Sequence, residues 1–137
     1  MRLNYLANAI GLTMMYIGVF ILTPVMISLY YGEFNTILPF VIPAVFSVIF
    51  GYLIKKCIPK SNELENLNDI KKSEALFIVA ASWIVISLVG AVPYLFFGLT
   101  PLNALFESVS GITTTGATIL SSFDYPHAFF FWRSFMQ

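Results

Sequence analysis

Three long uncharged stretches constrain this chain more than any other feature of its sequence. They run from Leu3 to Gly32, from Phe34 to Ile54 and from Ala75 to Phe106. Each exceeds the roughly 20 apolar residues that a helix needs to cross the hydrocarbon core of a bilayer. Because only helices and closed barrels satisfy their own backbone polar groups inside lipid, we predict an all-α membrane protein that sits in a lipid bilayer.

The composition agrees with a chain whose main solvent is not water. Of the 137 residues, 58% are hydrophobic and 10% are charged, whereas a typical soluble domain has about 25% charged residues. Seven basic residues balance seven acidic ones, so no net charge draws the chain to nucleic acid. Cys57 and His127 are the only residues of their types, which leaves no zinc-type ligand cluster. We expect neither a nucleic-acid partner nor a cofactor.

The lengths of the three stretches divide the chain. The first two each fit one helix, near residues 8–31 and 36–55, with kinks expected at the prolines. The third has 32 residues, too many for one ordinary span, so it must hold a helix plus a second element. We therefore expect a transmembrane hairpin (1–56), a connector (57–73) and a helix–loop–helix unit (74–137). Within the connector, helical spacing favours a short amphipathic turn at Leu64, Leu67 and Ile70.

Basic residues set the expected orientation, since short loops rich in Lys and Arg stay in the cytoplasm. Five lysines lie between the second and third stretches: Lys55, Lys56, Lys60, Lys71 and Lys72. The connection between the first two stretches, residues 31–35, contains no basic residue. We expect the N-terminus and the connector inside the cell and residues 31–35 outside, so that the third helix runs outward.

The end of the third stretch predicts a re-entrant loop. Thr100 followed by Pro101 is typical of a helix start, and Gly111 is expected to end this helix. Ten residues make about 15 Å of helix, which enters the hydrocarbon but cannot cross it. The run Thr113–Thr118 would then return in extended form to the outer side. A further helix begins after Pro126, and residues 126–137 supply only about 18 Å of it.

The residue types of this loop predict a cation site. Non-helical backbone at membrane depth is tolerated only where protein buries it or where it lines a watery cavity. The short helix would direct its partially negative C-terminal end toward that cavity, which favours a cation. Carbonyl and hydroxyl oxygens along Thr113–Thr118 can replace the water shell of a dehydrated cation. Gly116 allows backbone torsions that other residues disfavour.

Residues 106–118 carry a specific motif, FESVSGITTTGAT. It resembles the first pore loop of the Trk/Ktr/HKT superfamily of potassium transporters, particularly the bacterial Trk membrane subunit, and the surrounding helices resemble the same subunit. The resemblance implies potassium uptake across a bacterial inner membrane. It implies potassium binding at a filter core, with a further filter residue at each end: Thr114, Thr115, Gly116 and Ala117, flanked by Thr113 and Thr118. It also implies a homodimer in the intact form and a cytoplasmic nucleotide-binding regulatory subunit.

One departure from that superfamily affects the expected function. Its members hold four helix–loop–helix repeats around one pore, whereas this chain has one, so we expect an N-terminal fragment that contributes one of four filter segments. The alternative is a small membrane adaptor or regulatory protein, or a remnant without transport activity of its own. An enzyme is not expected, because the Ser108–Gly111 run lacks the glycine that the serine motif of an intramembrane protease requires at position 108.

Charged residues near the loop are further candidates. Glu107 is the only acidic residue of the predicted re-entrant segment, and an ionisable group at membrane depth is a candidate functional group. We expect it to support the filter from behind, with direct attraction of the ion as the alternative. Arg133 is expected either to snorkel outward or to pair with Asp124 or Glu107. Asp124 and His127 are interpreted as parts of an outer surface turn, with shaping of the pore mouth as the alternative.

Overall fold

The computed structural model describes residues 3–57 and 71–137, and all the regular structure in these two ranges is helical. Within these ranges, three helical segments are long and apolar enough to cross a membrane: Leu6–Tyr31, Phe34–Cys57 and Lys72–Phe96. The prediction of an all-helical chain with three long apolar spans is therefore confirmed. The amphipathic turn predicted at residues 64–70 lies outside the described ranges.

The first two spans form a hairpin with one interruption. The first span consists of α1 (Leu3–Phe20) and α2 (Thr23–Tyr31), and the second consists of a short 3-10 turn, η1 (Phe34–Thr36), followed by α3 (Ile37–Cys57). Pro24 lies in the first turn of α2, where its missing N–H has no helical partner to lose. The break between α1 and α2 therefore falls where the sequence predicts a kink, whereas Pro43 lies inside α3.

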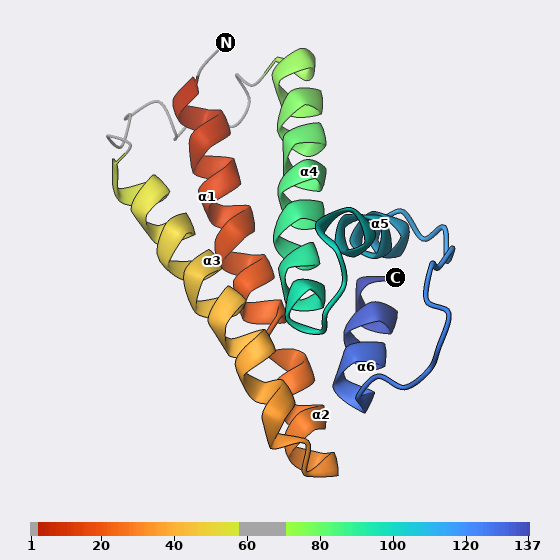
Figure 1. The fold of residues 1–137 in the computed structure, drawn as a ribbon. Helices are drawn as coiled ribbons and strands as arrows, with labels where there is room; N and C mark the ends of the chain where they lie inside the picture. Colours follow the sequence, from red (N-terminus) through yellow and green to blue (C-terminus); the bar gives the residue numbers. More distant parts are fainter. Residues whose placement is uncertain (1–2, 58–70) are drawn as a thin grey trace.

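α1 and α3 lie side by side because small residues let their backbones approach closely (Figure 1). A Cβ atom built on Gly51 would lie 2.5 Å from the carbonyl oxygen of Gly11. A Cβ atom on Gly18 would lie 2.9 Å from the carbonyl oxygen of Ala44. Any larger side chain at these positions would push the two helices apart.

The third span, α4 (Lys72–Phe96), packs against both α1 and α3. Figure 1 shows the start of α1, the end of α3 and the start of α4 at one end of the molecule, as three spans of alternating direction require. The short helix α5 (Pro101–Ile112) lies against α4. Residues 113–126 lead from α5 back toward the end where α4 stops, and α6 (His127–Met136) begins there (Figure 1).

An aromatic cluster joins these parts. Phe40 of α3, Tyr94 of α4, and Phe129 and Trp132 of α6 are fully buried. The rings of Tyr94 and Phe129 meet edge to face with centroids 5.2 Å apart. The Trp132 indole nitrogen donates to the carbonyl oxygen of Gly90 at 3.1 Å, so its one polar group is satisfied. The cluster fixes α6 against α3 and α4.

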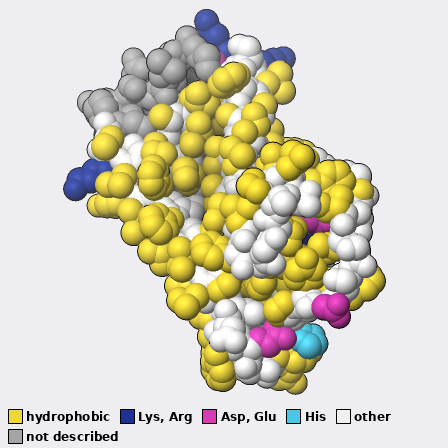
Figure 2. Space-filling model, viewed as in Figure 1, with side chains coloured by type: hydrophobic (Ala, Val, Ile, Leu, Met, Phe, Trp, Pro, Cys, Tyr) yellow, Lys and Arg dark blue, Asp and Glu magenta, His cyan; other side chains and the backbone are white. Residues whose placement is uncertain are grey.

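The outer surface is largely apolar. Figure 2 shows hydrophobic side chains over most of one face, with the charged side chains lying mainly toward its two ends. Met26, Tyr30 and Leu76 are 73%, 82% and 72% exposed. Large apolar patches of this kind are rare on soluble monomers and suit a surface that contacts lipid.

Candidate functional site

The short helix α5 begins as its sequence predicts but ends later. The Thr100 hydroxyl accepts a hydrogen bond from the Asn103 amide at 3.3 Å, and Pro101 is the first helical residue. The helix has 12 residues, about 18 Å. The prediction that Gly111 ends it is wrong, because the helix continues to Ile112.

Gly111 has a packing role in place of the predicted one. A Cβ atom on this residue would lie 3.1 Å from the Cβ atom of Met136. The missing side chain therefore makes room for the end of α6. A glycine near a helix end is read as a stop signal in the sequence, and nothing local distinguishes that signal from a close approach by a residue 25 positions away (136 − 111).

After α5 the chain turns back tightly. The amide of Thr114 donates to the carbonyl oxygen of Gly111 at 2.8 Å, and the amide of Thr115 donates to that of Ser110 at 3.0 Å. Thr114 has φ +55° and Gly116 has φ +73°. Gly116 adopts this left-handed conformation without steric conflict, whereas Thr114 does so at a cost of order 1–3 kcal/mol. The chain is then non-helical through residue 126.

A buried carboxylate holds the loop from behind. Glu107 of α5 is fully buried, and its Oε1 atom accepts hydrogen bonds from the Thr118 hydroxyl at 2.6 Å and the Ile119 amide at 2.9 Å. Its Oε2 atom accepts one from the Arg133 Nε atom at 2.8 Å. A buried charge is tolerated only when it is paired and hydrogen-bonded in this way. Of the two partners considered for Arg133, Glu107 rather than Asp124 forms the ion pair.

Two further contacts reach the carbonyl groups of the loop. The Ser110 hydroxyl donates to the Ala117 carbonyl oxygen at 2.6 Å. The Arg133 guanidinium donates to the Gly116 carbonyl oxygen at the longer distance of 3.4 Å. Ser110 is not among the residues predicted from the sequence, although a hydroxyl two residues before a helix end next to a polar loop is a usable signal.

The six residues predicted as the filter, Thr113–Thr118, form one continuous exposed run. The hydroxyls of Thr113 and Thr115 lie 2.8 Å apart, and the Thr118 hydroxyl is bound to Glu107. Within the described part of the chain, no donor reaches the carbonyl oxygens of Thr114 and Thr115. These oxygens are available to a ligand on the exposed side of the loop.

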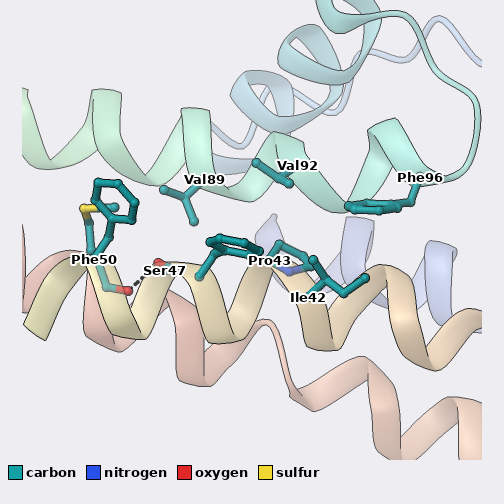
Figure 3. Close-up of a pocket in the computed structure, with 9 residues that line it drawn as sticks. Ile42, Pro43, Ser47, Phe50, Val89, Val92 and Phe96 are labelled. Atoms are coloured by element: carbon teal, nitrogen blue, oxygen red, sulfur yellow. Dashed lines mark hydrogen bonds between the residues drawn. The ribbon is translucent and has the colours of Figure 1, made fainter.

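A groove elsewhere on the molecule differs chemically from the polar loop. A groove of about 370 Å³ runs between α3 and α4, with residues of both helices facing into it (Figure 3). Its lining includes Phe50, Val89 and Phe96, and its one hydroxyl, on Ser47, donates to the Met14 carbonyl oxygen at 2.6 Å. With no free polar group, this groove can accommodate hydrocarbon but cannot replace the water shell of an ion.

Comparison with known proteins adds an independent line of argument. No protein-family model matches the chain. An uncharacterized cation transporter of Methanocaldococcus jannaschii is 37% identical over 124 residues, which cover 88% of this chain and 24% of the relative. The Trk system potassium uptake protein TrkH of Halomonas elongata is 30% identical over 141 positions, covering 100% of this chain and 28% of the relative. TrkH of Escherichia coli K12 is 45% identical over 73 residues, 50% of this chain and 15% of its own length.

The chain spans about a quarter of the length of the relatives that align along most of it. Three apolar spans together with these alignments identify an integral membrane protein. The relatives are transporters, as the sequence predicts, and not enzymes. The resemblance seen in residues 106–118 is therefore confirmed as a relationship, and the chain is homologous to one part of the Trk potassium uptake proteins and related cation transporters.

Proposed function

We propose that residues 113–118 form one wall of a potassium filter, and that this chain contributes one of the four filter segments of a Trk-type transporter. One observation carries the proposal: an exposed, non-helical run of hydroxyl and small residues follows a half-length helix and is held from behind by the buried Glu107. Such a run would be unfavourable on a lipid-facing surface, because its free carbonyl groups would lack hydrogen-bond partners there.

The free carbonyl oxygens are the primary ion ligands in this proposal. Those of Thr114 and Thr115 have no donor in the described chain and can replace ion-bound water. Those of Gly116 and Ala117 each accept one hydrogen bond, but a carbonyl oxygen has two lone pairs. The C-terminal end of α5 adds partial negative charge next to them.

Glu107 acts as a scaffold in this proposal. Its two oxygen atoms are occupied by Thr118, Ile119 and Arg133, and the guanidinium group compensates its charge. A carboxylate engaged in this way supports the loop, and because Arg133 neutralises its charge it attracts a distant ion only weakly. We therefore favour the supporting role over direct attraction of potassium.

The remaining features of the proposal rest on the relatives, on the distribution of lysines and on the resemblance of residues 106–118. Potassium is the proposed substrate because several relatives are potassium uptake proteins. The three other walls would come from further repeats. We keep the division of the chain into a hairpin (1–56), a cytoplasmic connector (57–73) and a first repeat (74–137). The proposed transporter lies in a bacterial inner membrane with its N-terminus inside the cell. In its intact form it is a homodimer that binds a cytoplasmic nucleotide-binding regulatory subunit.

Substitution of the filter glycine tests the proposal. In the intact transporter, Gly116→Ser should lower the selection of potassium over sodium about tenfold, which corresponds to about 1.4 kcal/mol. Uptake of the two ions into proteoliposomes gives the ratio. Gly98→Ser is the matched control, because Gly98 also has a positive φ, of +88°, but nothing lies within 4 Å of the position that a Cβ atom would take there.

Three outcomes count against the filter. Unchanged selectivity in folded Gly116→Ser protein contradicts it directly. An equal loss in Gly98→Ser protein would trace the effect to backbone strain alone. Absence of potassium uptake by the intact protein would favour the adaptor or remnant alternative over a transporter.

A further inference from the structure

The turn between α2 and η1 contacts the first turn of α6. The Oε1 atom of Glu33 accepts a hydrogen bond from the His127 amide at 3.2 Å and lies 2.8 Å from the Nδ1 atom of the same residue. The residue that precedes α6, Pro126, provides no side-chain cap. Glu33 thus caps α6 from a segment 94 residues away in the sequence, and a carboxylate at a helix N-terminus is favourable.

The hairpin holds Glu33 firmly in this position. The Glu33 amide donates to the Ser28 carbonyl oxygen at 2.8 Å. The Glu33 carbonyl oxygen accepts from both the amide and the hydroxyl of Thr36, at 3.0 and 2.7 Å. The Tyr31 ring stacks on the His127 ring with centroids 4.1 Å apart. Backbone, carboxylate and ring contacts therefore fix the start of α6 to the hairpin.

The same helix carries Arg133, the positively charged residue whose side chain reaches the loop. Arg133 lies six residues after His127, about 9 Å further along α6. Its guanidinium group contacts the Glu107 carboxylate and the Gly116 carbonyl oxygen. A shift or rotation of the first turn of α6 would move this guanidinium group relative to both partners.

We propose that Glu33 is a positioning residue for the ion-selective loop, because it fixes the start of α6 so that Arg133 stays between Glu107 and Gly116. The inference rests on the proposed filter function and extends it to the N-terminal hairpin. Under this proposal the hairpin determines the geometry of a loop with which Glu33 has no direct contact.

Hydrogen exchange of the intact, purified transporter tests the proposal without requiring transport. Glu33→Ala should speed exchange at least about tenfold, the factor expected for loss of one hydrogen bond to a charged group, both at the start of α6 and in residues 116–119. Glu33→Gln retains an acceptor oxygen and should restore most of the protection. Asn35→Ala is the matched control, since Asn35 lies exposed in the same turn and should leave exchange unchanged.

Ion selectivity is the second readout. Glu33→Ala should lower potassium over sodium selection, and Glu33→Gln should recover it. Faster exchange at the start of α6 with unchanged exchange in residues 116–119 would overturn the proposal, since Glu33 would then cap α6 and nothing more. An equal effect of Asn35→Ala would overturn it as well, because the turn as a whole would be responsible.

The two proposals fail in different ways. If Gly116→Ser leaves selectivity unchanged, the filter assignment fails, but the exchange of residues 116–119 still decides whether Glu33 positions the loop. If Glu33→Ala yields no folded protein, Glu33→Asp replaces it, because the shorter side chain withdraws the carboxylate from the α6 amides. The expected and contradicting results are then the same.

Discussion

The α1–α3 pair and the unit made of α5, residues 113–126 and α6 bury different groups. Between α1 and α3, backbones meet at Gly11 and Gly51, and the helices already satisfy their own hydrogen bonds. Behind the loop, the polar groups are the buried carboxylate of Glu107, the partly buried guanidinium of Arg133 and the buried hydroxyl of Ser110. Non-helical backbone inside a membrane needs partners from elsewhere. The hairpin should therefore be sensitive to side-chain size, and the loop to charge and hydrogen bonding.

The largest effect should follow removal of the buried carboxylate. Glu107→Ala leaves the Arg133 guanidinium, the Thr118 hydroxyl and the Ile119 amide without their acceptor. Breaking a buried ion pair costs about 3–5 kcal/mol, and this pair should lie at the lower end of that range because the Arg133 side chain is 23% exposed. We expect a lower thermal unfolding midpoint and loss of potassium uptake in the intact transporter. Glu107→Gln, which keeps an acceptor, should lose less, and an unaffected unfolding midpoint in Glu107→Ala would refute the scaffold role.

Enlarging a hairpin glycine should have the next largest effect. Gly51→Val places new atoms against the Gly11 carbonyl oxygen, 2.5 Å from the Cβ position, and overpacking of this kind costs about 1–3 kcal/mol. The unfolding midpoint should fall while ion selectivity in the folded protein stays unchanged. Ile49→Ala, at an exposed position on the same helix, is the control with no expected change. A selectivity change in Gly51→Val would contradict the expectation that packing in the hairpin affects stability alone.

A pair of serines gives a sharper and smaller test. Ser47 donates to a carbonyl group of a helix, and Ser110 donates to the Ala117 carbonyl group of the loop. Either change to alanine should cost about 1 kcal/mol of stability. Only Ser110→Ala should alter potassium over sodium selection, as measured by ion uptake into proteoliposomes. Equal selectivity in both variants would show that the Ala117 carbonyl needs no positioning.

The smallest expected effect is one of pH on the joint between Glu33 and the first turn of α6. Burial raises the pKa of Glu33, but hydrogen bonds from His127 and Ala128 outweigh it and hold the pKa below its ordinary value of 4.5. The joint is therefore stabilised above pH 4.5 and loosens as the pH falls through the lowered pKa. Hydrogen exchange at the start of α6 should report this loosening, and Glu33→Gln should remove it. A transition well above pH 4.5 would not fit this carboxylate.

Local patterns in the sequence were sufficient for the elements but not for their contacts. Hydropathy alone located the three spans, and Thr100 with Pro101 located the start of α5. Three contacts were not predicted from the sequence: Glu33 with His127, Ser110 with Ala117, and Gly111 with Met136. The sequence allows Arg133 to snorkel outward or to pair with Asp124 or Glu107, and only the structure shows the pair with Glu107. These pairings depend on how helices pack, which periodicity and helix-end signals do not encode.

Because Trp132 is buried, its fluorescence can report how α6 packs against the rest of the protein without an added label. The chain has two tryptophans. Trp83 is 49% exposed on α4, whereas Trp132 is fully buried with its indole N–H bonded to Gly90. Brominated lipids should quench the fluorescence of Trp83 and spare that of Trp132. The emission that remains is then an intrinsic optical signal from the helix that carries Arg133.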